Sequence, residues 1–293
     1  MKTEPDSLQR FLFEHAPIRG ERVHLDAAWH SVLTHQEYPP VLRQMMGELT
    51  AAAVLLAATL KLDGSLVLQI QGTGAIKLLV VECGGDLKLR ATAKWEGELH
   101  GSLSDLVGNG RFVITLAPKS GKQAYQGIVA LEGESIAEIL QNYMTRSEQL
   151  DTRLWLVSDE HSASGMLLQK LPEQAEDDSD VDAWSRVTQL TETLHNDELL
   201  HLPTQELLHR LFNEEDVRLF EVQPIVFQCS CSRDNVAQML RMLGAEEVDS
   251  ILTERQLIEV LCEFCNQRYE FDKIDAAQMF LPAATVEANE TRH

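Results

Sequence analysis

The chain has 293 residues and is strongly acidic, with a formal net charge of -21 at pH 7. Hydrophobic residues make up 44% of it, which is enough for a buried core and excludes a disordered chain. Because phosphate contacts need Lys and Arg in excess, the charge argues against binding to nucleic acid or to an anionic membrane. The length favours one large domain with a smaller one, or two domains of similar size.

The N-terminal segment has none of the features of a targeting signal, since it carries Glu4, Asp6 and Glu14 and no long apolar stretch. The longest apolar segment, residues 49–60, is shorter than the roughly 20 residues that cross a bilayer. We therefore expect a cytoplasmic protein with no membrane contact. In a reducing compartment, clustered cysteines indicate metal or redox chemistry rather than structural disulfides.

The first two thirds of the chain predict a mixed α+β domain. Residues 41–62 combine Ala and Leu with a polar edge and predict a mostly buried helix. Short alternating runs separated by Gly or Asp-Gly pairs follow as far as Gly133 and are typical of antiparallel strands joined by tight turns. Residues 135–149 predict a helix, and residues 151–172 predict two more strands. We place this N-terminal domain at residues 1–172.

An acidic run at residues 173–182 is typical of a solvated linker. Residues 182–213 then predict three short helices, and Pro203 suits the start of one of them. Their apolar residues recur at helical spacing, which is typical of packing against a core. We interpret residues 173–224 as an acidic and helical connector. Residues 225–293 are then a small C-terminal domain.

Four of the five cysteines occur in two close pairs, Cys229 with Cys231 and Cys262 with Cys265. Two close pairs of thiols suit a tetrahedral site, in which four thiolate sulfurs lie about 2.3 Å from one zinc ion. Zinc would displace the thiol protons, which are mostly retained at neutral pH by a free cysteine. We predict one Zn²⁺ per chain at these four residues. Cys83 lies in a predicted strand without a partner and is interpreted as a buried free thiol.

The sequence around the second pair predicts a strand, a CxxC turn and a second strand, with Phe264, Tyr269 and Phe271 available to pack beside the site. Between the two pairs the pattern predicts two short helices, one of them ending at Gly244. This C-terminal domain has few large apolar residues for its length. A small domain with so thin a core is expected to need its metal to stay folded.

Three functions other than a redox switch would also use such a cluster of cysteines. A thioredoxin-like oxidoreductase would place CxxC at the start of a helix, whereas LCEFC leads into a strand. A zinc ribbon that binds nucleic acid would be surrounded by basic residues, whereas this one is surrounded by Glu246, Glu247, Asp249, Glu254, Glu259 and Glu263. A zinc ion that only stabilises a small domain stays open, although CxC spacing is unusual for it. Zinc-bound thiolates can also be oxidised, and a disulfide no longer holds the metal.

No motif predicts a catalytic centre. The sequence contains no GxSxG nucleophile, no P-loop and no HExxH metal motif. Gly72-Thr73-Gly74 lacks the third glycine of a dinucleotide fingerprint and favours a hairpin turn. We therefore expect a protein that is not an enzyme.

The motifs together resemble the 33 kDa chaperonin family, also called heat shock protein 33. The resemblance covers nearly the whole chain and rests on CSCSRDN, EEVDSIL and LCEFC in the C-terminal part and on LVGNG, YQGIVALEG and YMTRSEQLDTRLWL before it. One departure is Asp151, where the family pattern leads us to expect Pro.

The resemblance implies a redox-regulated holdase of the bacterial cytosol. The reduced, zinc-bound form would be inactive, and oxidation by peroxide or hypochlorous acid would release zinc and form disulfides between Cys229 and Cys231 and between Cys262 and Cys265. The C-terminal domain and the connector would then lose structure, dimers would form, and unfolding client proteins would be held without ATP. The alternative is a zinc-stapled binding or regulatory protein without redox switching, with a thiol-disulfide oxidoreductase as the third possibility.

Overall fold

The computed structural model describes residues 5–60, 63–119, 123–172, 180 and 182–280. Its contacts divide the chain into two compact units, residues 1–228 and residues 229–293. Most of the predicted acidic linker lies outside the described residues. The helices of the predicted connector belong to the first unit, and the division into three domains stays a prediction.

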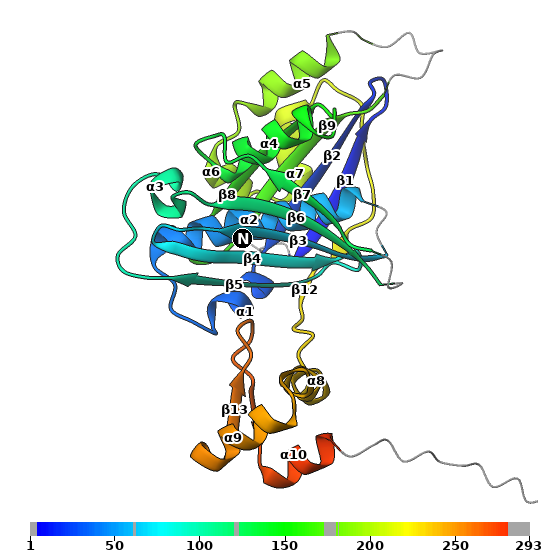
Figure 1. Ribbon diagram of the computed structural model, residues 1–293. Coiled ribbons are helices and arrows are strands. Elements are labelled where there is room, and N and C mark those ends of the chain that lie inside the picture. The colour runs from blue at the N-terminus through cyan, green and yellow to red at the C-terminus, as the bar shows by residue number, and fades with distance from the viewer. Residues whose placement is uncertain (1–4, 61–62, 120–122, 173–179, 181, 281–293) are drawn as a thin grey trace, which may run out of the picture. The chain divides into compact units, whose positions relative to one another are not determined.

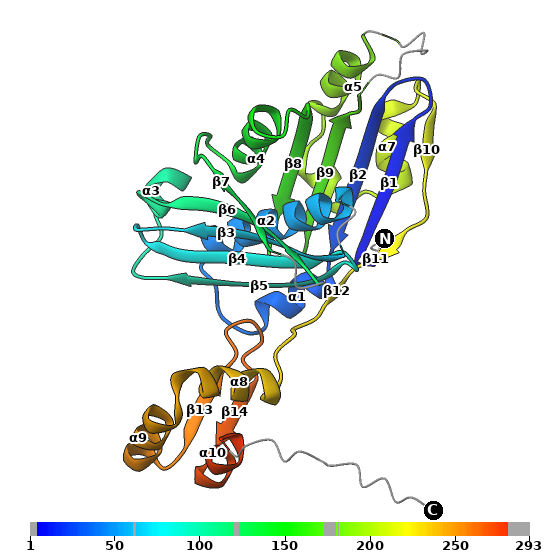
Figure 2. The same ribbon diagram turned by 45° about the vertical axis from the view of Figure 1, so that its right-hand side comes forward.

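The first unit contains two six-stranded sheets. Sheet A has the order β10-β1-β2-β9-β8, with β11 also paired to β1, and Figure 2 shows β1, β2, β9 and β8 side by side. Its strands are β1 (Ser7–Phe13), β2 (Ile18–Leu25), β8 (Thr152–Ser158), β9 (Ala163–Lys170), β10 (Val217–Leu219) and β11 (Gln223–Pro224). All of its pairings are antiparallel. The two strands predicted after the helix at residues 135–149 thus join the N-terminal strands, through the pairing of β9 with β2, and not the strands of sheet B.

Sheet B has the order β12-β5-β4-β3-β6-β7. Its strands are β3 (Gly64–Gln71), β4 (Ile76–Gly84), β5 (Lys88–Trp95), β6 (Arg111–Pro118), β7 (Tyr125–Val129) and β12 (Val226–Phe227). The antiparallel runs predicted from the alternating pattern are confirmed here, and Gly72-Thr73-Gly74 lies in the turn between β3 and β4. Only β12 joins in parallel, at the edge formed by β5.

Helix α2 (Pro40–Thr59) packs against strands of both sheets and lies between them (Figure 1, Figure 2). It confirms the predicted buried helix. At 20 residues it exceeds the apolar segment seen in the sequence and is long and apolar enough to cross a membrane, but 72% of its most apolar window is buried inside the protein. Its composition is that of a core helix covered on two sides. The other helices of this part are α1 (Ala27–Leu33), α3 (Leu103–Val107) and α4 (Ile136–Arg146).

Three helices confirm the helical prediction for the connector: α5 (Ala183–Thr191), α6 (Asn196–His201) and α7 (Thr204–Phe212). These connector helices form a second apolar core on one face of sheet A, separate from the core around α2. Phe13 and Phe212 meet there edge to face, with ring centroids 5.1 Å apart. From sheet A this core takes Phe11, Phe13, Ile18, Val157, Met166 and Leu168. The connector helices therefore cover an apolar sheet face that would otherwise be exposed.

Arg22 of β2 fastens the connector helices to sheet A. Its side chain is almost fully buried, and its guanidinium donates hydrogen bonds to the carbonyl oxygens of Leu199 (3.2 Å) and Leu202 (2.7 Å) at the end of α6. It also donates to Thr204 Oγ1 at the start of α7 (2.9 Å). Carbonyl groups at the end of a helix lack partners within the helix, and a cation there is favoured by the helix dipole.

The second unit contains α8 (Arg233–Leu243), α9 (Ala245–Arg255), the hairpin of β13 (Ile258–Leu261) and β14 (Arg268–Phe271), and α10 (Lys273–Met279). The two predicted helices, the end of the first at Gly244, and the strand-turn-strand pattern are confirmed. Its described core is small and consists of Ala237, Leu240, Val248, Leu252, Ile258, Phe271, Ala276 and Met279.

Glu21 of β2 is a buried carboxyl group, and burial raises its pKa from 4.5 to about 7 although Arg10 and Arg19 lower it. Arg10 Nε lies 3.4 Å from Glu21 Oε1. The folded chain therefore keeps this proton up to about pH 7, whereas the unfolded chain releases it near pH 4.5. Because the folded state binds more protons in that window, the free energy of unfolding falls as the pH rises through it.

We expect Glu21→Gln to stabilise the protein relative to wild type more at pH 8 than at pH 5, by up to roughly 3 kcal/mol, because the buried charge is removed. Urea unfolding of both proteins across this pH range measures the difference. Glu96→Gln, at a side chain that is 76% exposed, serves as the control and should show no such trend. A constant difference between pH 5 and pH 8 would contradict the prediction.

Candidate metal centre

The first cysteine pair lies in a loop fixed by the residues that follow it. Ser232 is the N-cap of α8, and its hydroxyl accepts a hydrogen bond from the backbone N–H of Asn235 (3.1 Å). The Asn235 amide in turn donates to the carbonyl oxygen of Ser230, between Cys229 and Cys231 (3.0 Å). These two hydrogen bonds hold the backbone of the CxC residues in a fixed conformation next to the start of α8.

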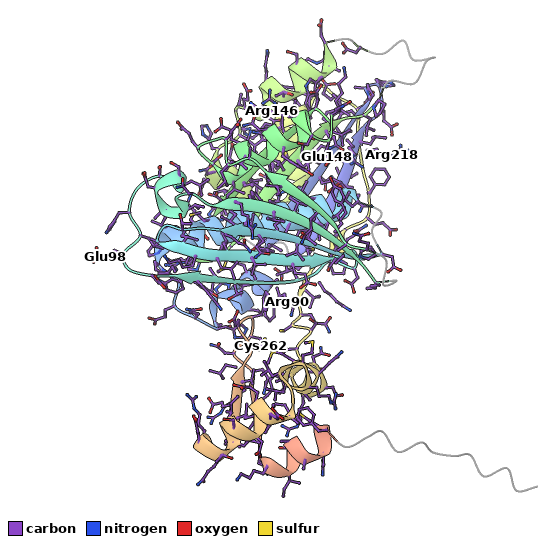
Figure 3. All side chains as sticks on the ribbon, viewed as in Figure 1. Arg90, Glu98, Arg146, Glu148, Arg218 and Cys262 are labelled. Atoms are coloured by element: carbon purple, nitrogen blue, oxygen red, sulfur yellow. The ribbon has the colours of Figure 1, made fainter. Side chains whose placement is uncertain are left out.

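The second pair lies at the tip of the β13–β14 hairpin, where Figure 3 labels Cys262. The Cys262 N–H donates to the carbonyl oxygen of Gln267 (3.0 Å), and the Asn266 N–H donates to the carbonyl oxygen of Cys262 (2.8 Å). Asn266 has a φ of 52°, a left-handed conformation that Asn adopts more readily than most residues. This turn brings Cys262 and Cys265 to the same side of the hairpin tip.

The four sulfurs predicted as ligands come together. All lie within 4.8 Å of one another, with 3.6 Å between the Sγ atoms of Cys229 and Cys262 and 3.3 Å between those of Cys231 and Cys265. Four sulfurs about 2.3 Å from one zinc ion would be about 3.8 Å apart, so the cluster fits a tetrahedral zinc site. Within the described residues it is the only group of this kind.

The electrostatics of the cluster also favour a cation. Burial raises the pKa of Cys229, but hydrogen bonds from Cys231 and the other thiols outweigh it and lower that pKa to about 7. Burial raises the pKa of Cys265, and hydrogen bonds with Cys231 and Cys229 raise it further. One thiolate therefore forms near neutral pH and makes further ionisation costly. A divalent cation is what allows four thiolates to coexist in this space.

Arg233 joins the two halves of the centre without a metal. Its guanidinium donates to the carbonyl oxygen of Glu270 (2.7 Å), lies 2.8 Å from Asp275 Oδ2, and stacks over the ring of Phe271 with 4.3 Å to the centroid. The start of α8, which follows the first pair, is thereby held against β14, which follows the second. This contact is not visible in the sequence, because an arginine next to a helix cap has the pattern of a surface residue.

Tyr269 packs beside the site as predicted, and its hydroxyl also contacts one of the four sulfurs. Its hydroxyl donates a hydrogen bond to Cys231 Sγ at 3.1 Å, and this bond raises the pKa of Tyr269 to about 12. Alternation along β14 places Tyr269 on the same face as the buried Phe271. That alternation was visible in the sequence, whereas the partner of the hydroxyl was not.

Comparison with known proteins agrees with this geometry. The family model described as "Hsp33 protein" matches residues 6–272. The chain belongs to the Hsp33 family. Members of this family are redox-regulated holdase chaperones and not enzymes, and the four-cysteine cluster is consistent with their zinc site.

Full-length relatives support the assignment to the Hsp33 family. The 33 kDa chaperonin of Methylobacillus flagellatus is 58% identical over 98% of this chain and 99% of its own length. That of Chromobacterium violaceum is 53% identical over 98% of both chains. The crystal structure of the 33 kDa chaperonin from Thermotoga maritima superposes with a TM-score of 0.78 at 20% identity, covering 94% of this chain and 97% of that one, and supports the fold.

Cys83, the fifth cysteine, lies in β4 and is fully buried, as the sequence predicts. Burial raises the pKa of its thiol to about 12, with Asp86 and Glu82 raising it further. A thiol without access to solvent and without thiolate character reacts slowly with oxidants. Cys83 is therefore an internal control for the chemistry of the other four.

Removal of zinc should unfold the second unit, because eight buried residues make too small a core to hold it together alone. Amide hydrogen exchange with and without a chelator measures this in the full chain. We expect residues 233–279 to lose protection while β3, β4 and α2 keep theirs, and excess zinc to restore it. Unchanged protection in residues 233–279 would show that the metal is not needed for folding.

Proposed function

We propose that Cys229, Cys231, Cys262 and Cys265 bind one Zn²⁺ in the reduced chain and act as the switch of a holdase chaperone. The observation that carries this proposal is the convergence of four half-buried thiols within 4.8 Å in a unit with a small core. Zinc would supply the charge that keeps the four thiolates together. Oxidation of the thiolates would then remove the zinc ligands, and the zinc ion that stabilises the second unit would be released.

The oxidation balances with peroxide as the oxidant. Two thiols lose two electrons and two protons, a bond forms between their sulfurs, and the O–O bond of hydrogen peroxide breaks to give two water molecules. The family resemblance implies disulfides within each motif, Cys229 with Cys231 and Cys262 with Cys265. Sulfurs of different motifs are also close, since Cys229 lies 3.6 Å from Cys262 and Cys231 lies 3.3 Å from Cys265, so the pairing is a separate point to test.

Release of the connector helices would expose the client surface. α5, α6 and α7 have only six to nine residues each, and isolated helices this short are unstable in water. Once detached from sheet A they would unfold, and the apolar residues of both the helices and the sheet would become accessible. Unfolding client proteins expose apolar segments of their own, which such a surface would bind without ATP.

Two further parts of the proposal follow from the family resemblance. The oxidised form would associate as a homodimer, which exposed apolar surface would favour. The protein would act in the cytoplasm, where thiols are normally reduced and oxidation signals stress.

Treatment of the reduced, zinc-loaded chain with peroxide at raised temperature should release about one zinc ion per chain as suppression of client aggregation appears. A chromogenic chelator and light scattering of a denaturing client follow both in one sample, and reductant with zinc should reverse both. Peptide mapping then shows whether disulfides lie within or between the motifs.

Cys83→Ala is the matched control and should switch like wild type, whereas Cys231→Ser should not hold zinc at wild-type affinity. Zinc release without a gain in protection would support the alternative, a zinc-stapled protein with no redox switching. Equal protection before and after oxidation would argue against the switch in the same way.

Arg22→Met should loosen the connector helices in the reduced protein. It removes hydrogen bonds from a charged donor that are worth roughly 1.5–3 kcal/mol, so these helices should open roughly 10- to 100-fold more often. Hydrogen exchange of residues 183–212 measures the opening, and aggregation assays measure client protection without oxidant, which should rise.

Arg19→Met is the control for this experiment. Arg19 lies on the same strand but bonds to Gln169 and not to the connector helices. Faster exchange in Arg22→Met without any gain in protection would show that clients bind elsewhere.

A further inference from the structure

The hydroxyl of Tyr269 and the sulfur of Cys231 form a contact that the proposed function does not use. The Oη–Sγ distance is 3.1 Å, and the hydroxyl is the donor. Tyr269 follows the CxxC motif along the hairpin, whereas Cys231 belongs to the CxC motif before α8. The bond therefore links a side chain of one half of the centre to a sulfur of the other half.

The position of Tyr269 is fixed from three directions. It pairs across the hairpin with Val260, and its ring packs against the small core of this unit. Arg233 binds the carbonyl oxygen of Glu270, the next residue, and so holds β14 against the start of α8. The hydroxyl is thus held in place by the fold rather than by its bond to sulfur.

A hydrogen bond to a thiolate withdraws electron density from the sulfur. It stabilises the charged form and lowers the nucleophilicity of that sulfur, since a less basic thiolate attacks more slowly. Partners of this kind around a metal ligand also orient it, and their loss typically costs 10- to 100-fold in metal affinity.

We propose that Tyr269 is a positioning residue that orients the Cys231 sulfur and moderates its reactivity toward oxidants and alkylating agents. The inference rests on the proposed role of the four cysteines and adds a specific residue to it. Tyr269 would raise zinc affinity and at the same time slow attack by Cys231, so that the switch resists low oxidant concentrations.

Tyr269→Phe in the full-length, zinc-loaded chain tests this, because it keeps the ring and removes only the hydroxyl. The chain is treated briefly with iodoacetamide, and mass spectrometry locates the modification on each cysteine. We expect Cys231 to react about 10-fold faster relative to Cys229 than in wild type. Chelator competition should show a zinc affinity about 10-fold lower.

Thr253→Val is the control, since it removes a hydroxyl from α9 that bonds only to the backbone of its own helix. If Tyr269 had a purely structural role, Tyr269→Phe would raise the reactivity of all four cysteines together. An unchanged ratio of Cys231 to Cys229 modification would overturn the proposal as well.

3-Fluorotyrosine at position 269 gives a second test with the fold kept. Its more acidic hydroxyl is a stronger donor and should slow Cys231.

The two proposals fail in distinguishable ways. A wild-type chain that carries no zinc after purification under reducing conditions contradicts the proposed function. The ratio of Cys231 to Cys229 modification tests the hydrogen bond in either case, because the ratio compares two sulfurs within the same molecule.

Discussion

The mutual repulsion of four crowded thiolates is the constraint on which the second unit depends. Sulfurs within 4.8 Å of one another cannot all be charged unless a cation lies among them. A cation there would join the two cysteine-bearing segments of the second unit, whose shared core is small. In the proposed function, metal binding and folding of the second unit are one equilibrium. Any reaction that uses up thiolates would then act on both, and a chemical change at two sulfurs would unfold the whole unit.

The connector helices are also folded only through contacts outside themselves, in their case with sheet A. They are too short to persist alone, and they are held to sheet A by an apolar face and by the buried guanidinium of Arg22. The remainder of the first unit differs, because α2 is enclosed by two six-stranded sheets. The molecule thus combines a stable scaffold with elements near the limit of stability, and the proposed regulation would act on the latter.

The sequence predicts those features that depend on local pattern. Helix α2, the antiparallel strands of sheet B, the three connector helices and the CxxC hairpin all have a clear period or a recognisable turn, and the four cysteines are identifiable by spacing alone. The two-residue parallel strand β12 has no such pattern. The pairing of β9 with β2 is not predictable in this way, because it joins segments far apart in the chain. The burial of Arg22 is not predictable either. A charged residue in a strand suggests an exposed position, and only the carbonyl groups of α6 explain its burial.

Selectivity among the five cysteines comes from where the fold places them. Cys83 has the pKa of its thiol raised to about 12 inside sheet B, whereas hydrogen bonds lower that of Cys229 to about 7 at a half-buried position. An oxidant that reacts with thiolates therefore reacts with the four-cysteine cluster before it reacts with Cys83. The same oxidant concentration then leaves the scaffold undamaged. Burial of one thiol and clustering of the other four are complementary requirements. A switch that unfolds part of a chain on oxidation needs the rest of that chain to be inert to the oxidant.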